Sequence, residues 1–212
     1  MLEIVLNKKE RFKRDGLILK TMNHETRDIL KAWSAISLAF AIVLSGGLSL
    51  SLPLLTTFLT MFLISGFTVG LGFLFHELAH RTLARSYGCS AEFRSFDQML
   101  ILAVLMSFLG FVFAAPGAVF IHGRVTREKN GKISAVGPAT NIIIALIFLG
   151  IGFLALPEIV QTIASYGKMI NAWLALFNMI PLGNFDGVKI LHWDKKVYGL
   201  MLAVSALLVF VL

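Results

Sequence analysis

Residues 55–83 read LTTFLTMFLISGFTVGLGFLFHELAHRTL, an apolar run whose first charged side chain is Glu77. A helix of this length can cross the hydrocarbon core of a bilayer. Two histidines four residues apart, His76 and His80, leave the same face of a helix one turn apart. That spacing suits two ligands of one tetrahedral Zn²⁺, and Glu77 can serve as a general base. Because polar side chains are expensive in a membrane helix, these three residues predict a functional metal site.

The composition of the chain is that of an integral membrane protein. Hydrophobic residues make up 57% of its 212 residues and charged residues 15%, whereas about 25% of a soluble domain is charged. The single cysteine, Cys89, cannot form a disulfide within the chain, and we interpret it as a thiol without a role. We therefore expect an all-α polytopic membrane protein of one domain, built as a helix bundle.

Positive charge is clustered between the apolar runs. The formal net charge is +7, and all but Lys168 of the 19 Lys and Arg residues lie in four clusters, at 1–31, 81–94, 122–132 and 189–196. Such clusters mark the cytosolic face of a membrane protein. They place the N-terminus and the opening of the metal site in the cytosol. No aromatic-interleaved basic stripe accompanies them, so nucleic acid is not an expected partner.

Five apolar runs are long enough to cross the bilayer. They are Ala32–Leu52, Leu55–Leu83, Ala135–Leu156, Ile163–Pro181 and Val197–Leu212. The residues before them form a cytosolic N-terminal arm, 1–31, which lacks the apolar core of a signal peptide. Within this arm, Leu2–Leu6 and Gly16–Lys20 alternate as weak strands do.

A sixth run, within residues 97–121, is ambiguous. Basic clusters flank it on both sides and should share the cytosolic face, so one crossing would put the cluster at 122–132 outside. We favour a re-entrant element over a full span. It would consist of a half-helix to Gly110 and an extended return through Pro116 to Ile121.

A tight hairpin is expected after this element. Asn130-Gly131 is a strong signal for a two-residue turn, which would pair Val119–Thr126 with Lys132–Val136. The predicted fold is therefore a bundle of five to six transmembrane segments with a small re-entrant/β-hairpin element.

A catalytic zinc takes three protein ligands, so a third ligand must come from elsewhere in the chain. Elimination leaves Asp186, which follows a span that ends on the cytosolic side. There Pro181 stops the helix and nearby glycines free the backbone. The alternative that Asp186 only caps a helix beginning near Gly187 stays open. We set aside the acids in basic or outer segments and interpret the other histidines as solvated: Glu92, Asp97, Glu128, Glu158, Asp194, His24, His122 and His192.

These residues together resemble the site-2 protease family of intramembrane zinc metalloproteases. The family's signatures are HExxH on one membrane helix and NxxPxxxxDG on a later one. In this chain the first matches residues 76–80 and the second matches residues 178–187. A family-like GPATN at 137–141 lies between them. The resemblance covers residues 55 to 195. It implies a membrane-embedded metalloprotease domain over 32–212.

The resemblance also implies the roles of the site residues. Zn²⁺ would be bound by His76, His80 and Asp186, with Glu77 as the catalytic base. Asn178 matches a family position that binds substrate or stabilises the oxyanion. Zinc rather than another divalent ion rests on the ligand types and on this resemblance.

The expected function is hydrolysis of peptide bonds in transmembrane substrate proteins, as in regulated intramembrane proteolysis. Glu77 would activate a zinc-bound water, and an amide, Asn178 first and Asn141 second, would oppose the oxyanion. The expected partners are the substrate protein and the lipid bilayer; the oligomeric state is not predicted. A prenyl-protein-type metallopeptidase would need a later Glu ligand, and no suitable one follows. The alternative is a membrane zinc transporter or a non-catalytic zinc-dependent scaffold, although a transporter should carry acidic or His residues in several spans.

Overall fold

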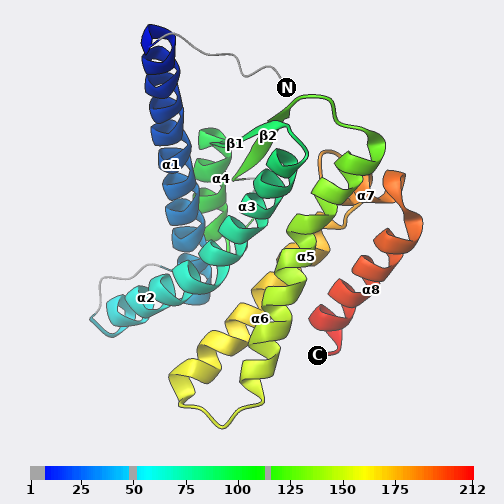
Figure 1. The fold of residues 1–212 in the computed structure, drawn as a ribbon. Coiled ribbons are helices and arrows are strands. Elements are labelled where there is room, and N and C mark those ends of the chain that lie inside the picture. Colours follow the sequence, from blue (N-terminus) through cyan, green and yellow to red (C-terminus); the bar gives the residue numbers. More distant parts are fainter. Residues whose placement is uncertain (1–7, 48–51, 113–115) are drawn as a thin grey trace.

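The computed structural model describes residues 8–47, 52–112 and 116–212 of the chain and is mostly helical (Figure 1). The elements are α1 (Lys8–Leu44), α2 (Leu52–Ser65), the π-helical turn η1 (Gly66–Gly70), α3 (Leu71–Ser86), β1 (Ser90–Ser95), α4 (Asp97–Ser107), β2 (Gly117–His122), α5 (Arg127–Gly152), α6 (Glu158–Asn178), α7 (Asp186–Trp193) and α8 (Lys195–Phe210). The expected helical fold with a small β element is confirmed.

Within the part of the chain that the structure describes, two helices are long and apolar enough to cross a membrane. One is Pro53–Ser86, 34 residues, in which α2, η1 and α3 follow one another without a break, and the other is α5, 26 residues. At 1.5 Å per residue they measure about 51 and 39 Å, against about 30 Å of hydrocarbon core. The other three expected crossings fall largely on α1, α6 and α8. A total of five to six transmembrane segments stays a prediction.

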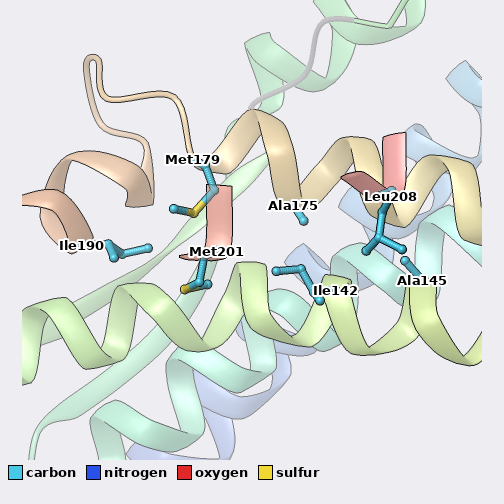
Figure 2. Close-up of a cluster of buried hydrophobic side chains, with 8 residues drawn as sticks. Ile142, Ala145, Ala175, Met179, Ile190, Met201 and Leu208 are labelled. Atoms are coloured by element: carbon cyan, nitrogen blue, oxygen red, sulfur yellow. The ribbon is translucent and has the colours of Figure 1, made fainter. Parts of the chain in front are cut away.

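The central element is α5, which packs against α3, α6 and α7 (Figure 1). One hydrophobic core joins it to α6, α7 and α8 (Figure 2). The buried side chains of this core are Ile142, Ala145, Ala172, Ala175, Met179, Ile190, Met201 and Leu208. This core holds the beginning of α7 beside α5, a position that matters for the site described below.

A second core joins α1, α3, β1, α4 and α6. At its centre the rings of Phe73 on α3 and Phe93 on β1 meet edge to face, with their centroids 5.8 Å apart. Aromatic pairs in this geometry add to the stability gained from burial alone. The sheet is thereby packed directly against the helix that carries both HExxH histidines.

The two-stranded sheet is not the predicted hairpin. β1 pairs antiparallel with β2, with Ser90 opposite His122 and Ser95 opposite Gly117. Residues 132–136, which were predicted to pair across Asn130-Gly131, lie in the first turns of α5. The prediction of a turn was wrong because the Thr126 side chain accepts a hydrogen bond from the Lys129 N–H and so caps a helix here.

The segment that connects the two strands leaves the sheet and returns to it at the same end of the strand pair. The Phe96 N–H donates to the Pro116 carbonyl over 3.0 Å, so the two ends of the segment are adjacent. Its helix, α4, has 11 residues and a length of about 16 Å, too short to cross a bilayer. A short helix therefore lies where the half-helix was predicted, and part of the return lies outside the described residues; re-entry into the membrane stays a prediction.

The N-terminal region contains a helix where a strand was expected. Gly16–Lys20 lies within α1, so the predicted strand is wrong; Leu2–Leu6 lies outside the described residues. Five residues are too few for a period of two to be told from a period of 3.6, and a helix once nucleated extends through them. The predicted boundary between residues 31 and 32 falls inside α1, which joins the N-terminal arm to the rest of the chain.

Candidate metal centre

His76 and His80 lie on one face of α3 and are buried. Their Nε2 atoms face each other at 3.0 Å. Both imidazoles point toward α5, because the Nδ1 of each forms a hydrogen bond with a residue of that helix. The spacing of four residues thus produces the shared face that the sequence predicts.

Asp186 comes from a different part of the chain and completes the group. Its Oδ2 lies 3.4 Å from His76 Nε2 and 3.1 Å from His80 Nε2. The N-cap of α7 is Phe185, so Asp186 is the first residue inside that helix and does not cap it. The alternative role as an N-cap is therefore not what the structure shows.

The glycine after Asp186 explains how the carboxylate is presented. A Cβ on Gly187 would lie 2.4 Å from the Met179 carbonyl oxygen, so a side chain at this position would push α7 away from the end of α6. In the Asp-Gly pair, Asp186 therefore supplies the candidate ligand, and Gly187 allows the close backbone contact that orients it.

Hydrogen bonds determine which nitrogen of each imidazole carries the proton. His80 Nδ1 lies 2.6 Å from the Ile133 carbonyl, which can only accept, so Nδ1–H donates. His76 Nδ1 lies 2.6 Å from Asn141 Oδ1. The Asn141 amide is oriented by its NH₂ group, which donates to the Gly72 carbonyl over 3.1 Å, so its oxygen must accept from His76. Both Nε2 atoms are therefore left with lone pairs.

Three acceptor atoms, two imidazole lone pairs and one carboxylate oxygen, consequently face one another in a buried place. Such a group is electrostatically unfavourable unless a cation joins it. Tetrahedral Zn²⁺ with bonds of 2.0–2.1 Å would hold its ligand atoms about 3.3 Å apart. The distances here are 3.0, 3.1 and 3.4 Å. The donor set and its spacing both fit zinc.

The charge state of Asp186 suits this purpose. Burial acts to raise the pKa of its carboxyl group, but the neighbouring imidazoles of His80 and His76, when they are protonated and positively charged, lower it by more. The net pKa lies below the usual range of an aspartate, so the side chain is an ionised carboxylate, the form that binds metal. Its other oxygen, Oδ1, lies 3.5 Å from Lys189 Nζ, which offsets part of the buried negative charge.

The remaining predicted residues lie at different places around the group. Glu77 is half-buried and follows His76 directly on α3. Asn178 is the last residue of α6, and its amide donates to the Leu174 carbonyl over 2.9 Å. Asn141 is fully buried, and its amide is occupied by the contacts with His76 and Gly72 already described.

Gly137 explains the GPATN element. A Cβ on this residue would lie 2.3 Å from His80 Nε2 and 2.6 Å from His76 Nε2. The missing side chain therefore leaves the space in which the ligand atoms converge. Pro138 follows it inside α5 and has no N–H to donate, so one backbone hydrogen bond of the helix is missing. The carbonyl left without this bond is next to that of Ile133, which accepts from His80.

The other histidines do not join the group. His122 and His192 are exposed and His24 is half-buried, as expected for solvated side chains. Among the residues that the structure describes, His76, His80 and Asp186 form the one cluster of potential metal ligands.

Comparison with known proteins agrees with this chemistry. The chain is 42% identical over 144 residues, 66% of its own length and 75% of the relative's, to a protein of Methanocaldococcus jannaschii named "Putative zinc metalloprotease MJ0611". The chain belongs to this zinc metalloprotease family. Its cofactor is Zn²⁺, for which the three-residue group is a fitting site. No family model matches the chain. No solved structure matches it.

One residue of the site region was missed by sequence reasoning. Asn171 on α6 is fully buried and receives a hydrogen bond from Asn141 over 3.0 Å. The available signal was the presence of an amide in the middle of an apolar run, which in a membrane helix is a reason to suspect a function.

Proposed function

We propose that this metalloprotease is an intramembrane protease of the site-2 type, which hydrolyses peptide bonds of transmembrane substrate proteins. The observation that carries the proposal is the position of the metal group. Its two histidines lie in Pro53–Ser86, one of the two helices long and apolar enough to cross a membrane. A hydrolytic centre on such a helix can reach peptide bonds that are within or beside the bilayer.

In this proposal His76, His80 and Asp186 hold the zinc ion. Zinc bound at such a site would lower the pKa of a coordinated water to about 7 and would polarise the substrate carbonyl. Glu77, next to His76 and half-buried beside the group, accepts the proton of the attacking water. It then delivers that proton to the leaving amine. Because its neighbours on α3 are ligands, Glu77 is held at the reacting centre by the same helix.

Asn178 is our candidate for the amide that opposes the oxyanion. It ends α6 and is half-buried, while one of its N–H groups is used within its own helix. Asn141 was the second candidate, but its oxygen and its NH₂ group are engaged inside the protein. We therefore propose that Asn141 orients His76 and that Asn178 stabilises the oxyanion.

The substrate must expose its backbone before it can be cleaved. A transmembrane helix hides its carbonyls in hydrogen bonds, so we expect helices weakened by Gly or Pro to be preferred. β1 occupies one edge of β2, and an unwound substrate segment could add to the other edge by strand pairing. This sheet packs against α3, so a segment bound there would lie near the metal group.

The proposed topology keeps the predicted orientation. The arm at 1–31 and the opening of the site face the cytosol, and residues 32–212 form the membrane-embedded metalloprotease domain. Regulated intramembrane proteolysis is the kind of pathway that such an enzyme serves. The described residues contain one cluster of metal-binding side chains, whereas a transporter would need several along a path through the membrane.

Cleavage of a transmembrane substrate by purified protein in proteoliposomes tests the proposal. Glu77→Gln should retain zinc and lower the cleavage rate by about 10²–10⁴-fold, because the base is lost and the three ligands remain. Glu128→Gln is the matched control, since Glu128 is exposed on the first turn of α5. A chelator should abolish cleavage by the parent, and added Zn²⁺ should restore it. If Glu77→Gln cleaves within about tenfold of the parent, Glu77 is not the base.

A further inference from the structure

Two buried asparagines lie behind His76, on the side away from the other ligands. Asn141 on α5 and Asn171 on α6 both have no exposed surface. Asn141 Oδ1 contacts His76 Nδ1 at 2.6 Å, and Asn141 Nδ2 contacts Asn171 Oδ1 at 3.0 Å. A chain of two amides therefore runs from the metal-binding helix through α5 to α6.

The direction of every hydrogen bond in this chain is determined by backbone carbonyls. Asn171 donates to the Gly167 carbonyl over 2.9 Å and to the Thr68 carbonyl over 3.4 Å. Since carbonyls only accept, Asn171 must turn its oxygen toward Asn141. Asn141 then donates from both N–H positions, to Asn171 and to the Gly72 carbonyl, and offers its oxygen to His76. If either amide were flipped, its oxygen would face the oxygen atoms that now accept its hydrogen bonds.

The backbone of the metal-binding helix is shaped to receive these amides. A Cβ on Gly72 would lie 2.2 Å from Asn171 Oδ1, so a side chain there would exclude Asn171. Thr68, whose carbonyl accepts from Asn171, belongs to the π-helical turn η1. Such turns are rare inside α-helices and are frequent at functional sites. The glycine and the irregular turn both place helix backbone against the amide pair.

We propose that Asn141 and Asn171 are positioning residues, an amide relay that keeps the proton of His76 on Nδ1 and its Nε2 lone pair toward the metal. They act through His76 and do not touch the substrate. Hydrogen bonds from outside the ligand group orient metal-binding histidines, and their loss commonly weakens metal binding by about 10–100-fold. This inference rests on the ligand role of His76 in the proposed function, but it requires no cleavage.

Zinc affinity measured by competition with a chromogenic chelator tests the relay. Asn141→Leu should weaken zinc binding by about 10–100-fold. Asn171→Leu should weaken it less, because the Gly72 carbonyl still orients Asn141. Thr140→Val is the control: its hydroxyl is bonded to Val136 of its own helix, and its affinity should equal the parent's. Parental affinity in both Asn→Leu variants would overturn the proposal.

A measurement on the unaltered sequence makes the test independent of folding defects. In ¹⁵N-histidine-labelled metal-free protein at about pH 8, where free imidazole is neutral, the ¹⁵N shifts should place the His76 proton on Nδ1. A proton on Nε2 would overturn the relay. A protein with the expected shifts and zinc affinity that cleaves no transmembrane substrate would instead contradict the proposed function and leave the relay standing.

Discussion

At the scale of single residues, the metal centre depends as much on an absent side chain as on the three that are present. Gly137 faces both ligand imidazoles, and a Cβ there would come within 2.3 Å of His80 Nε2. A methyl group needs about 3.4 Å or more from a nitrogen, so one imidazole would have to move. The ring of His80 is held by the Ile133 carbonyl on the same helix as Gly137, which limits how it can yield.

Gly137→Ala should therefore lower zinc content sharply while the fold is preserved. We expect a loss of zinc affinity of about tenfold or more, comparable to the removal of a residue that orients a ligand. Metal analysis of purified protein measures it, with circular dichroism as a check of helix content. Gly150→Ala is the matched control on the same helix, because a Cβ at Gly150 meets nothing within 4 Å. Equal zinc content in the two variants would show that the imidazoles can rearrange.

Asp186 offers a second prediction at this scale. Asp186→Ala leaves two histidines, which form a weak site, so purified protein should lose nearly all of its zinc. Asp97→Ala, at an exposed carboxylate on α4, should keep zinc at the parental level. Full zinc occupancy in Asp186→Ala would redirect the search for the third ligand to another side chain.

The meeting of the three candidate ligands could be predicted from sequence because its parts are local patterns. The spacing of His76 and His80 places both on one helix face, and elimination among the acids selects Asp186. Asn171 could not be found in this way, because a lone asparagine in α6 has no partner at a fixed spacing. Its partners, Asn141 and the Thr68 carbonyl, lie 30 and 103 residues away in the chain. Only the packing of three helices shows what it does.

At the scale of secondary-structure elements, the predicted hairpin illustrates how a local signal can be overridden. Asn130-Gly131 favours a tight turn, yet Gly131 lies in the first turns of α5, where Trp193 packs against it. A Cβ on Gly131 would come within 2.2 Å of the Trp193 Cβ. The glycine thus serves a contact with α7, 62 residues later in the chain, and not a turn. The true partner of β2 is β1, which sequence periodicity did not indicate.

The contact of α1 with the sheet is the element-scale feature that most directly supports α3. Glu25 is buried, and one of its oxygens lies 2.7 Å from Arg81 Nε and accepts from the Phe93 N–H over 3.0 Å. Arg81 follows His80 directly, so α1 is tied to the metal-binding helix beside its second ligand. Asp28, one turn later, accepts from the Ser95 N–H over 3.4 Å.

Glu25→Ala should destabilise the protein, because it leaves a buried N–H and a partly buried guanidinium without their acceptor. We expect a loss of about 2 kcal/mol, or a melting temperature lower by about 4–8 °C in detergent. Glu128→Gln removes an exposed ion pair with Lys132 and should change stability by less than about 0.5 kcal/mol. If both variants have the same melting temperature as the parent, the Glu25 contact does not stabilise the packing of α1 against α3.

At the scale of the whole molecule, the sheet determines how the chain can cross a membrane. β1 and β2 begin and end beside each other, and the described residues of the segment between them form one helix, the short α4. If the chain is inserted in a membrane as proposed, both strands lie on the same side of the bilayer. α5 starts five residues after β2 and runs for 26 residues, long enough to carry the chain to the other side.

Accessibility of single cysteines in oriented vesicles tests this topology. In a Cys89→Ser background, Arg94→Cys on β1 and Lys129→Cys at the start of α5 should react with an impermeant thiol reagent from the same side. Ala155→Cys, in the exposed connection after α5, should react only from the opposite side. Opposite labelling of positions 94 and 129 would establish a crossing between β1 and α5. The antiparallel pairing of β1 with β2 would then be incompatible with the membrane-inserted protein, since paired strands cannot lie on opposite faces of a bilayer about 30 Å thick.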